Sequence, residues 1–404
     1  MQTIVFDDKT QASFYPICLT RSVGDLRCGI LKLRQRLASI FSGDEADNAF
    51  APSSVIIAPR IAELYAERHP DWQINSIPPG NKLYLNSRLR VTETLIAEIN
   101  NLAKNCALMN GEQLIAARSE APIDINAPHG LALIPSELPL YDCLSDIIHD
   151  NARMLNWDFN HYFYDKDNYF ETEPGVTVLH PYNVWIGEEV VLAPGVVLNA
   201  ADGPIVLDTG VQVMANAVLT GPLYIGKNSI VKIGAKIYGS TSIGPVCKIG
   251  GEIEGSIFQA YSNKQHDGFL GHSYIGEWVN LGADTNNSDL KNTYKNVAYY
   301  SYYHKAKTDS GTKFLGCAIG DHSKTGINCS INTGCVIGIG SNLWGRALIS
   351  DFIPDFSWCE VDQLSEYRFE AFCQTAAIVK ERRKLKFSSA ETELYKELFS
   401  KHGE

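Results

Sequence analysis

The sequence lacks the marks of a membrane-spanning, exported or nucleic-acid-binding protein. None of its apolar runs reaches the ~18–20 residues that a membrane-spanning helix needs. No signal peptide is recognisable, because residues 1–6 lead directly into Asp7 and Asp8. A net charge of −11 argues against nucleic-acid or anionic-membrane partners, which are bound by clustered Lys and Arg. We therefore expect a cytoplasmic protein, in which a local basic pocket for one small phosphorylated ligand remains compatible with the charge.

Paired cysteines are also missing. The ten cysteines are scattered and form no Cys-x-x-Cys pair, as the positions of Cys18, Cys106 and Cys329 illustrate. In a chain without an export signal, such cysteines are expected to be reduced and mostly buried. A length of 404 residues predicts two or three domains.

A sixfold periodicity of aliphatic residues dominates the second half of the chain. Two unbroken ladders are Ile225, Val231, Ile237, Ile243, Ile249 and Ile319, Thr325, Ile331, Ile337, Leu343, Ile349. Shorter pieces are Ile186, Leu192, Leu198, then Ile205, Val211, Ala217, and Ile275, Leu281. An amphipathic helix repeats every three to four residues and a strand every two, so neither explains a period of six. The period predicts a left-handed parallel β-helix of hexapeptide repeats over residues 176–356.

The ladder is broken in two places. Eight residues separate Ile249 from Ile257, after which positions 257, 263, 269, 275 and 281 suggest a new frame of inward-facing residues. Residues 282–318 form a long interruption rich in Asn, Lys and Tyr. Such a loop is usually functional, and we expect it to reach a neighbouring subunit; a surface excursion is the alternative.

The flanking segments do not share the sixfold period. Residues 1–165 alternate β-like runs (3–6, 54–58, 106–109) with helical patterns (29–41, 91–105). This alternation predicts an α/β domain of Rossmann-like type with a mostly parallel sheet. Residues 357–404 form a C-terminal extension with helical runs at 361–384 and 390–399, expected to cap the open end of the β-helix.

Particular motifs resemble a known family. The stretch Lys264 to Gly271, followed by Ile275 to Ala283, is similar to the acetyltransferase signature of the bifunctional enzymes that make UDP-N-acetylglucosamine. Residues 19–31 resemble the opening of a divergent branch of that family, found in Bacteroidetes-type bacteria. The resemblance implies an N-terminal nucleotidyltransferase domain followed by a glucosamine-1-phosphate acetyltransferase domain.

The resemblance also implies particular roles in the β-helix. It makes His266 the general base of acetyl transfer, and it places Asn280 and Lys295 where the sugar phosphate is held. Phe269 stands where the family has a substrate-contacting Tyr, and Asp289 where it has an Asn. Histidine has a pKa suited to accepting a proton near pH 7. The repeat places His266 at a corner, and Asn280, one residue before the inward Leu281, is expected to point outward.

Other interpretations of the two histidines in this stretch remain open. His272, at an equivalent corner six residues on, is the rival base, and either histidine could be a solvated turn residue. A zinc site between subunits is a further alternative, although His266 and His272 are expected to diverge.

The family's N-terminal signals are weaker in this sequence. The Gly-rich loop that cradles a triphosphate is absent, since no glycine precedes Gly24. Arg21, Arg27 and Lys32 are candidates for nucleotide binding, and Glu112 is the candidate metal ligand for Mg²⁺ with an NTP, UTP being the expected one. Each has a plain alternative, as a basic residue that opens a helix or as a turn residue.

We therefore expect a homotrimeric sugar-phosphate transferase with two activities. It would acetylate an amino-sugar 1-phosphate with acetyl-CoA, and it would transfer a nucleotidyl group from an NTP to the sugar 1-phosphate. One alternative is a nucleotidyltransferase whose β-helix only holds subunits together. Another is a non-catalytic protein that binds a nucleotide sugar.

Overall fold

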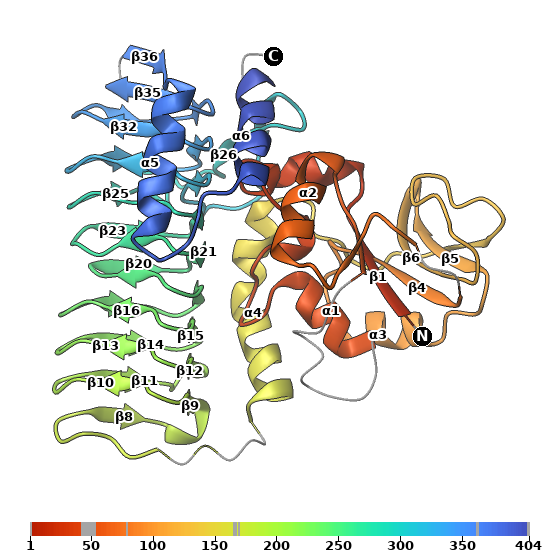
Figure 1. The fold of residues 1–404 in the computed structure, drawn as a ribbon. Coiled ribbons are helices and arrows are strands. Elements are labelled where there is room, and N and C mark those ends of the chain that lie inside the picture. Colours follow the sequence, from red (N-terminus) through yellow and green to blue (C-terminus); the bar gives the residue numbers. More distant parts are fainter. Residues whose placement is uncertain are drawn as a thin grey trace.

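The two predicted domains lie side by side. The computed structural model describes residues 2–41, 54–77, 80–164, 168, 170–360 and 363–401. An α/β domain lies beside a tall column of short strands, and helix α4 runs between them (Figure 1). The predicted combination of an α/β domain, a β-helix and C-terminal helices is confirmed. In the described part of the chain no helix is both long and apolar enough to cross a membrane.

The N-terminal domain is built on one seven-stranded sheet in the order β3-β2-β1-β4-β6-β5-β7. Its strands are β1 (Gln2–Phe6), β2 (Ser54–Ile56), β3 (Gln73–Ile74), β4 (Lys82–Asn86), β5 (Cys106–Asn110), β6 (Gln113–Ser119) and β7 (Ala132–Pro135). Strands β3, β2, β1 and β4 are parallel, whereas β6 is antiparallel to both of its neighbours. The sheet is thus mixed, and the prediction of a mostly parallel one holds only for its first half.

The helices of this domain are shorter than the sequence predicted. They are α1 (Leu33–Phe41), α2 (Pro59–Arg68) and α3 (Glu93–Asn100), with short 3-10 helices at Lys9–Phe14, Ile17–Leu19 and Val23–Asp25. Helix α1 begins at Leu33 rather than at Gly29, because the preceding segment is tied to α4. Gly29 donates its N–H to Asn151 (2.6 Å) and Ile30 donates to Asp158 (2.8 Å). Gly29 has φ +80°, and a Cβ there would collide with Asp158 and Met154.

Helix α4 (Leu144–Tyr162) joins the two domains. Its residues Leu144, Ile147 and Ile148 share one apolar cluster with Phe14 of the N-terminal domain and Tyr274 of the β-helix. Asp158 of the same helix forms a fully buried ion pair with Arg36. The interface between the domains is therefore a continuous core.

The β-helix has three faces of short parallel strands. One face is a nine-stranded sheet of β9 (Val184–Ile186), β12 (Ile205–Leu207), β15 (Leu223–Ile225), β18 (Thr241–Ile243), β21 (Ile257–Ala260), β24 (Tyr274–Glu277), β28 (Ala318–Ile319), β31 (Val336–Ile337) and β34 (Phe352–Ile353). Helix α4 and the N-terminal domain cover this face (Figure 1).

The other two faces are each divided into two sheets. One face holds β10 (Val191–Leu192), β13 (Gln212–Val213), β16 (Ile230–Val231), β19 (Lys248–Ile249) and β22 (Asn263–Lys264), then β29 (Lys324–Thr325), β32 (Asn342–Trp344), β35 (Ser357–Glu360) and β36 (Gln363–Glu366). The other holds β8 (Thr177–Leu179), β11 (Val197–Asn199), β14 (Val218–Thr220), β17 (Lys236–Ile237), β20 (Glu252–Glu254) and β23 (Phe269–Gly271), then β25 (Asn286–Asn287), β30 (Ser330–Ile331) and β33 (Leu348–Ile349). A 3-10 helix at Pro181–Asn183 precedes the second coil.

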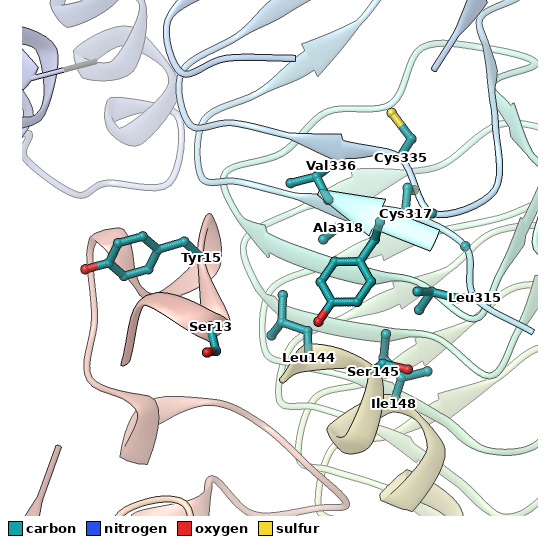
Figure 2. Close-up of a pocket in the computed structure, with 13 residues that line it drawn as sticks. Ser13, Tyr15, Leu144, Ser145, Ile148, Leu315, Cys317, Ala318, Cys335 and Val336 are labelled. Atoms are coloured by element: carbon teal, nitrogen blue, oxygen red, sulfur yellow. The ribbon is translucent and has the colours of Figure 1, made fainter. Parts of the chain in front are cut away.

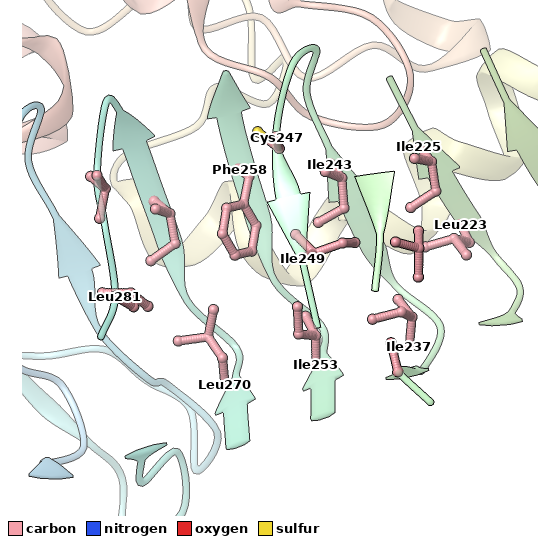
Figure 3. Packing of buried hydrophobic residues seen from close by; sticks show 14 of the residues in the cluster. Leu223, Ile225, Ile237, Ile243, Cys247, Ile249, Ile253, Phe258, Leu270 and Leu281 are labelled. Carbon is pink, nitrogen blue, oxygen red and sulfur yellow. The ribbon is translucent and has the colours of Figure 1, made fainter. Parts of the chain in front are cut away.

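The predicted ladders form the interior of this column. Every member of the runs 225–249 and 319–349 is buried, and aliphatic side chains of successive coils stack on one another (Figure 3). The sixfold period is therefore confirmed as the core-forming pattern.

The predicted frame 257, 263, 269 is wrong by one residue. Phe258 pairs with Ile243, Lys264 with Ile249 and Leu270 with Ile253, so these residues face inward. The coil after Ile249 is shortened, with the next inward residue only four positions on, at Ile253. Ile257 is also buried, but against the N-terminal domain, so both sides of its strand are apolar.

The long interruption folds back onto its own chain. It forms a hairpin of β26 (Ala298–Ser301) and β27 (Ala306–Asp309). Tyr302 contacts Tyr15 of the N-terminal domain edge-on, with ring centroids 5.7 Å apart, and Tyr300 stacks on Phe352 at 4.0 Å. Aromatic side chains of the hairpin are thus used within the chain, and contact of this loop with a neighbouring subunit stays a prediction.

The C-terminal helices do not cap the column. Strands β35 and β36 form an antiparallel hairpin near its end, whereas α5 (Phe369–Glu381) runs along its side (Figure 1). Helix α6 (Ser389–Lys401) packs against α2, and Val361, the predicted first helical residue, lies outside the described residues. Glu391 of α6 accepts from Arg68 of α2 (2.7 Å) and from Lys380 of α5, so one carboxylate links three helices.

Truncation of an inward ladder residue should destabilise the β-helix. Ile243 is fully buried, so Ile243→Ala should lower the free energy of unfolding by about 2–5 kcal/mol through lost burial and the cavity left behind. Ile233 is 67% exposed at a corner, and Ile233→Ala is the matched control with little expected effect. Urea unfolding of both variants decides this, and equal losses would contradict the assignment of the ladder to the core.

Candidate functional site

His266 lies in an open hollow at a corner of the β-helix. It follows β22, and its side chain is exposed, as predicted from its place in the repeat. The hollow has a volume of about 610 Å³ and is lined by Lys232, Ile233, Gly251, Gln265, His266, Asp267, Ala283 and Asp284. The His266 side chain is therefore accessible to a ligand in the hollow.

Lys264 supports the turn that carries His266 from inside the β-helix. It occupies an inward ladder position and is 1% exposed. Its ammonium group donates to the backbone carbonyls of His266 (2.9 Å) and Asp267 (3.3 Å). Burial lowers the pKa of Lys264 to about 8, against the opposing effect of the Asp267 and Asp284 carboxylates. Sequence reasoning missed this residue because a lysine is not expected in an aliphatic ladder.

A groove adjoins the hollow, and the two share Gln265. The groove has a volume of about 270 Å³ and is lined by Lys248, Tyr261, Asn263, Gln265, Trp278, Asn280, Lys324, Val379, Arg382 and Arg383. Its floor is one row of outward side chains on paired strands, running Lys248, Asn263, Asn280, Lys324. Its far wall comes from α5 and the residues just after it. Asn280 therefore points outward near His266, as predicted.

Aromatic rings and amides shape the rest of the groove. Tyr261 stacks on Trp278 with ring centroids 4.3 Å apart. Asn263 donates to Asn280 (3.4 Å) and accepts from Arg383 (3.4 Å), so the amide floor is connected to the wall. Both backbones at Tyr261 and Trp278 have positive φ, which marks them as corner residues of successive coils.

The remaining predicted residues of the β-helix lie elsewhere. Asp289 accepts from His272 Nδ1 (2.8 Å), in a cluster that includes the rings of Phe314 and His149. Lys295 is exposed on the interrupting loop, and Phe269 lines neither the hollow nor the groove. The structure thus places His266 in the hollow and Asn280 in the adjoining groove, whereas Asp289 lines neither.

The predicted nucleotide-binding residues make contacts with other side chains of the protein. Arg21 is buried and forms ion pairs with Asp321 and with Glu277 (3.6 Å) of the β-helix. Arg27 is buried over the ring of Tyr224, with 5.1 Å from its guanidinium carbon to the ring centroid. Lys32 donates to Asp25 (2.9 Å).

The predicted metal ligand, Glu112, lies at the surface of the protein. The Glu112 side chain is 94% exposed, and its nearest cation is Lys9 at 3.9 Å. Within the ranges that the structure describes, no three His, Cys, Asp or Glu side chains are arranged to hold a metal ion. The residues present do not form a ready Mg²⁺ site around Glu112.

A polar network at the carboxyl ends of β1 and β4 was not predicted. Asp7 follows β1 and accepts from Ser87 (2.7 Å) and Ser22 (2.9 Å), and burial raises its pKa to about 6. Asp8 accepts two hydrogen bonds from Arg88. Strand order reverses between β1 and β4, the position at which open α/β sheets usually bind ligands. The pair of aspartates directly after a β-like run was the available signal.

A small cavity at the domain junction is unsuited to a charged substrate. It has a volume of about 30 Å³ and lies between the segment of Ser13 and Tyr15, the start of α4, and strands of the β-helix (Figure 2). Its described lining contains no charged side chain, and Leu144, Ile148, Leu315 and Val336 make it largely apolar.

The fold and site define a hexapeptide β-helix protein with an N-terminal α/β domain and an exposed histidine beside a groove. Residues 3–165 match the model of the family described as sugar nucleotidyl transferase. The chain is 28% identical over 174 residues to the bifunctional protein GlmU of Synechococcus sp. (strain CC9311), covering 43% of this chain and 33% of that one. It is 35% identical over 107 residues to GlmU of Methanococcus aeolicus, covering 26% of this chain and 25% of that one. The resemblance predicted from the sequence is thereby confirmed, although the chain spans well under half the length of these curated relatives.

Solved β-helix structures are more distant. The UDP-N-acetylglucosamine acyltransferase of Francisella novicida is 15% identical with a TM-score of 0.32, covering 57% of this chain and 76% of that one. A putative acetyltransferase of Bacillus cereus is 13% identical with a TM-score of 0.20, covering 57% of this chain and 96% of that one.

The buried Lys264 should give the protein a particular pH dependence. Its pKa of about 8 is below the value of 10.5 for a solvated lysine, so the unfolded chain binds more protons between these values. Stability should therefore rise as pH increases through this window, and Lys264→Met should remove on the order of 2 kcal/mol of that rise.

Urea unfolding at pH 7.5 and at pH 10 measures this difference between wild type and Lys264→Met. Lys236→Met is the control, because the Lys236 side chain is 60% exposed on the outside of β17. An identical pH dependence in wild type and Lys264→Met would contradict the burial of a charged lysine in the ladder.

Proposed function

We propose that the β-helix acetylates the amine of an amino-sugar 1-phosphate with acetyl-CoA, in the pathway of UDP-N-acetylglucosamine. The observation that carries this proposal is the exposed His266 in a hollow that adjoins, at Gln265, a groove floored by Asn263 and Asn280. The similarity to bifunctional GlmU proteins supports it.

His266 acts as the general base in this reaction. It takes a proton from the amine as the amine nitrogen attacks the thioester carbonyl, and the carbon–sulfur bond breaks when the tetrahedral intermediate collapses. The proton is then available to the departing CoA thiolate. The amides of Asn263 and Asn280 hold sugar hydroxyls, and Lys264 fixes the carbonyls of the turn that bears the base.

Loss of His266 should abolish most of this activity. His266→Ala should lower kcat for acetyl transfer to glucosamine 1-phosphate by about 100- to 10,000-fold, the usual contribution of a general base. Thiol release from acetyl-CoA measures the rate.

His272→Ala is the matched control, because His272 is held by Asp289 outside the hollow. If the His272 variant loses activity and the His266 variant does not, the base has been assigned to the wrong histidine. If wild type releases no thiol, the proposed acetyl transfer is wrong.

A second activity is proposed for the N-terminal domain, namely transfer of a nucleotidyl group from an NTP such as UTP to the sugar 1-phosphate. The match of residues 3–165 to the sugar nucleotidyl transferase family supports it. Mg²⁺ accompanies NTPs in such chemistry, but the surroundings of Glu112 among the described residues do not fit a metal site. The residues proposed for this reaction are therefore Asp7 and Asp8 after β1, and Ser87 and Arg88 after β4. Arg21 and Lys32 form ion pairs within the protein, and Arg27 packs over Tyr224.

Two simpler functions remain in competition. Pyrophosphate release from UTP and a sugar 1-phosphate, without thiol release from acetyl-CoA, would indicate a nucleotidyltransferase whose β-helix serves as a scaffold. Calorimetric binding of a nucleotide sugar with neither turnover would indicate a binding protein. We place the reactions in the cytoplasm, where acetyl-CoA and NTPs are available, and propose a homotrimer, which light scattering of the full chain tests.

A further inference from the structure

The groove between the β-helix and α5 concentrates positive charge on an acidic protein. Four of its lining side chains are cationic, namely Lys248, Lys324, Arg382 and Arg383, although the net charge of the chain is −11. Among the described residues, no carboxylate lines this groove. Other cations of the protein are paired with carboxylates, as Arg36 is with Asp158. The cations of this groove have no such partner among its described lining residues.

The cations converge on the groove from two separate elements. Lys248 and Lys324 project from the outer row of the β-helix, whereas Arg382 and Arg383 follow the last turn of α5. Basic residues are common at helix C-termini, where they offset the helix dipole. That effect accounts for the arginines alone and leaves two lysines facing them across the groove unexplained.

The surroundings of both lysines disfavour their positive charge, by burial at Lys324 and by burial together with neighbouring cations at Lys248. Burial lowers the pKa of Lys324 to about 8, and its ammonium group donates to the backbone carbonyl of His322 (2.7 Å). The pKa of Lys248 is lowered by burial and then by the nearby positive charges of Arg383, Lys232 and Arg382. A ligand with negative charge would relieve this repulsion.

We infer that the groove binds a phosphoryl group of a substrate, held by Arg383, Lys324 and their neighbouring cations. The amide row of Asn263 and Asn280 lies between the two lysines and suits the hydroxyls of the attached sugar or ribose. Adjacent strands are about 4.8 Å apart, so Lys248 and Lys324, three steps apart in the row, lie about 14 Å apart. That span is long enough for a phosphorylated ligand to lie along the groove, which adjoins the hollow of His266 at Gln265. The site stands on the groove itself, and only the identity of its ligand rests on the proposed function.

Calorimetry of the full chain with inorganic phosphate tests the site directly. Wild type should bind phosphate at millimolar concentrations, and Arg383→Gln and Lys324→Met should each weaken binding by about tenfold or more, equivalent to about 1.4 kcal/mol. Arg383 is at the surface, so its variant should fold normally, and thermal unfolding checks the Lys324 variant. Lys236→Met, on another face, should bind as wild type does. Absence of binding to wild type, or unchanged binding in both groove variants, would overturn the inference.

Steady-state acetyl transfer then identifies the source of the phosphoryl group. A raised KM of Arg383→Gln for glucosamine 1-phosphate, with an unchanged KM for acetyl-CoA, assigns the groove to the sugar phosphate. The reverse pattern assigns it to the phosphates of CoA. An active Arg383→Gln variant with neither KM changed would overturn the inference. If wild type has no acetyltransferase activity, the proposed function fails, and phosphate binding still decides the existence of the site.

Discussion

The register between successive coils of the β-helix is the constraint on which the rest of the structure depends. Each coil pairs with the next through parallel strands, and the aliphatic interior fixes which side chains point inward. A shift by one residue would exchange the interior and the surface of a whole coil. The row Lys248, Asn263, Asn280, Lys324 exists on the outside only because Ile249, Lys264, Leu281 and Thr325 are turned inward beside it. The packing that stabilises the β-helix thus also determines which side chains of the candidate site point outward.

The interface between the domains also uses residues for which the sequence suggested another role. One face of the β-helix, including Tyr274 and Ile257, is covered by α4 and by the segment before α1. Residues that a sequence motif suggests for phosphate binding are used there as contacts, since Arg21 pairs with Asp321 and Gln259 exchanges hydrogen bonds with the Asp25 and Arg27 backbone. An arginine near the start of a helix has the same appearance in the sequence in both roles, and only its surroundings in the structure distinguish them.

The repeat made the architecture predictable, because a sixfold period of aliphatic residues is typical of the β-helix fold. It also placed His266 at a corner and turned Asn280 outward. The frame after Ile249 was not predictable, since Ile257 is buried on the opposite side of its strand and Lys264 replaces an aliphatic residue. The groove was not predictable either, because its wall is contributed by α5, about a hundred residues after Asn280, and no periodicity reports that contact. The two aspartates after β1 gave a signal in the sequence, but the burial that raises the pKa of Asp7 and the contact of Asp8 with Arg88 depend on later segments of the chain.

Glu391 connects a helix of the N-terminal domain to the helix that lies along the β-helix. Its carboxylate is shared by Arg68 on α2 of the N-terminal domain and by Lys380 on α5, whose end forms the wall of the groove. Helix α2 begins directly after β2, at the same edge of the sheet as Asp7. One carboxylate therefore connects the edge of the N-terminal sheet to the helix that walls the groove. The position of the groove wall is thus set by both halves of the chain, although the floor of the groove belongs to the β-helix alone.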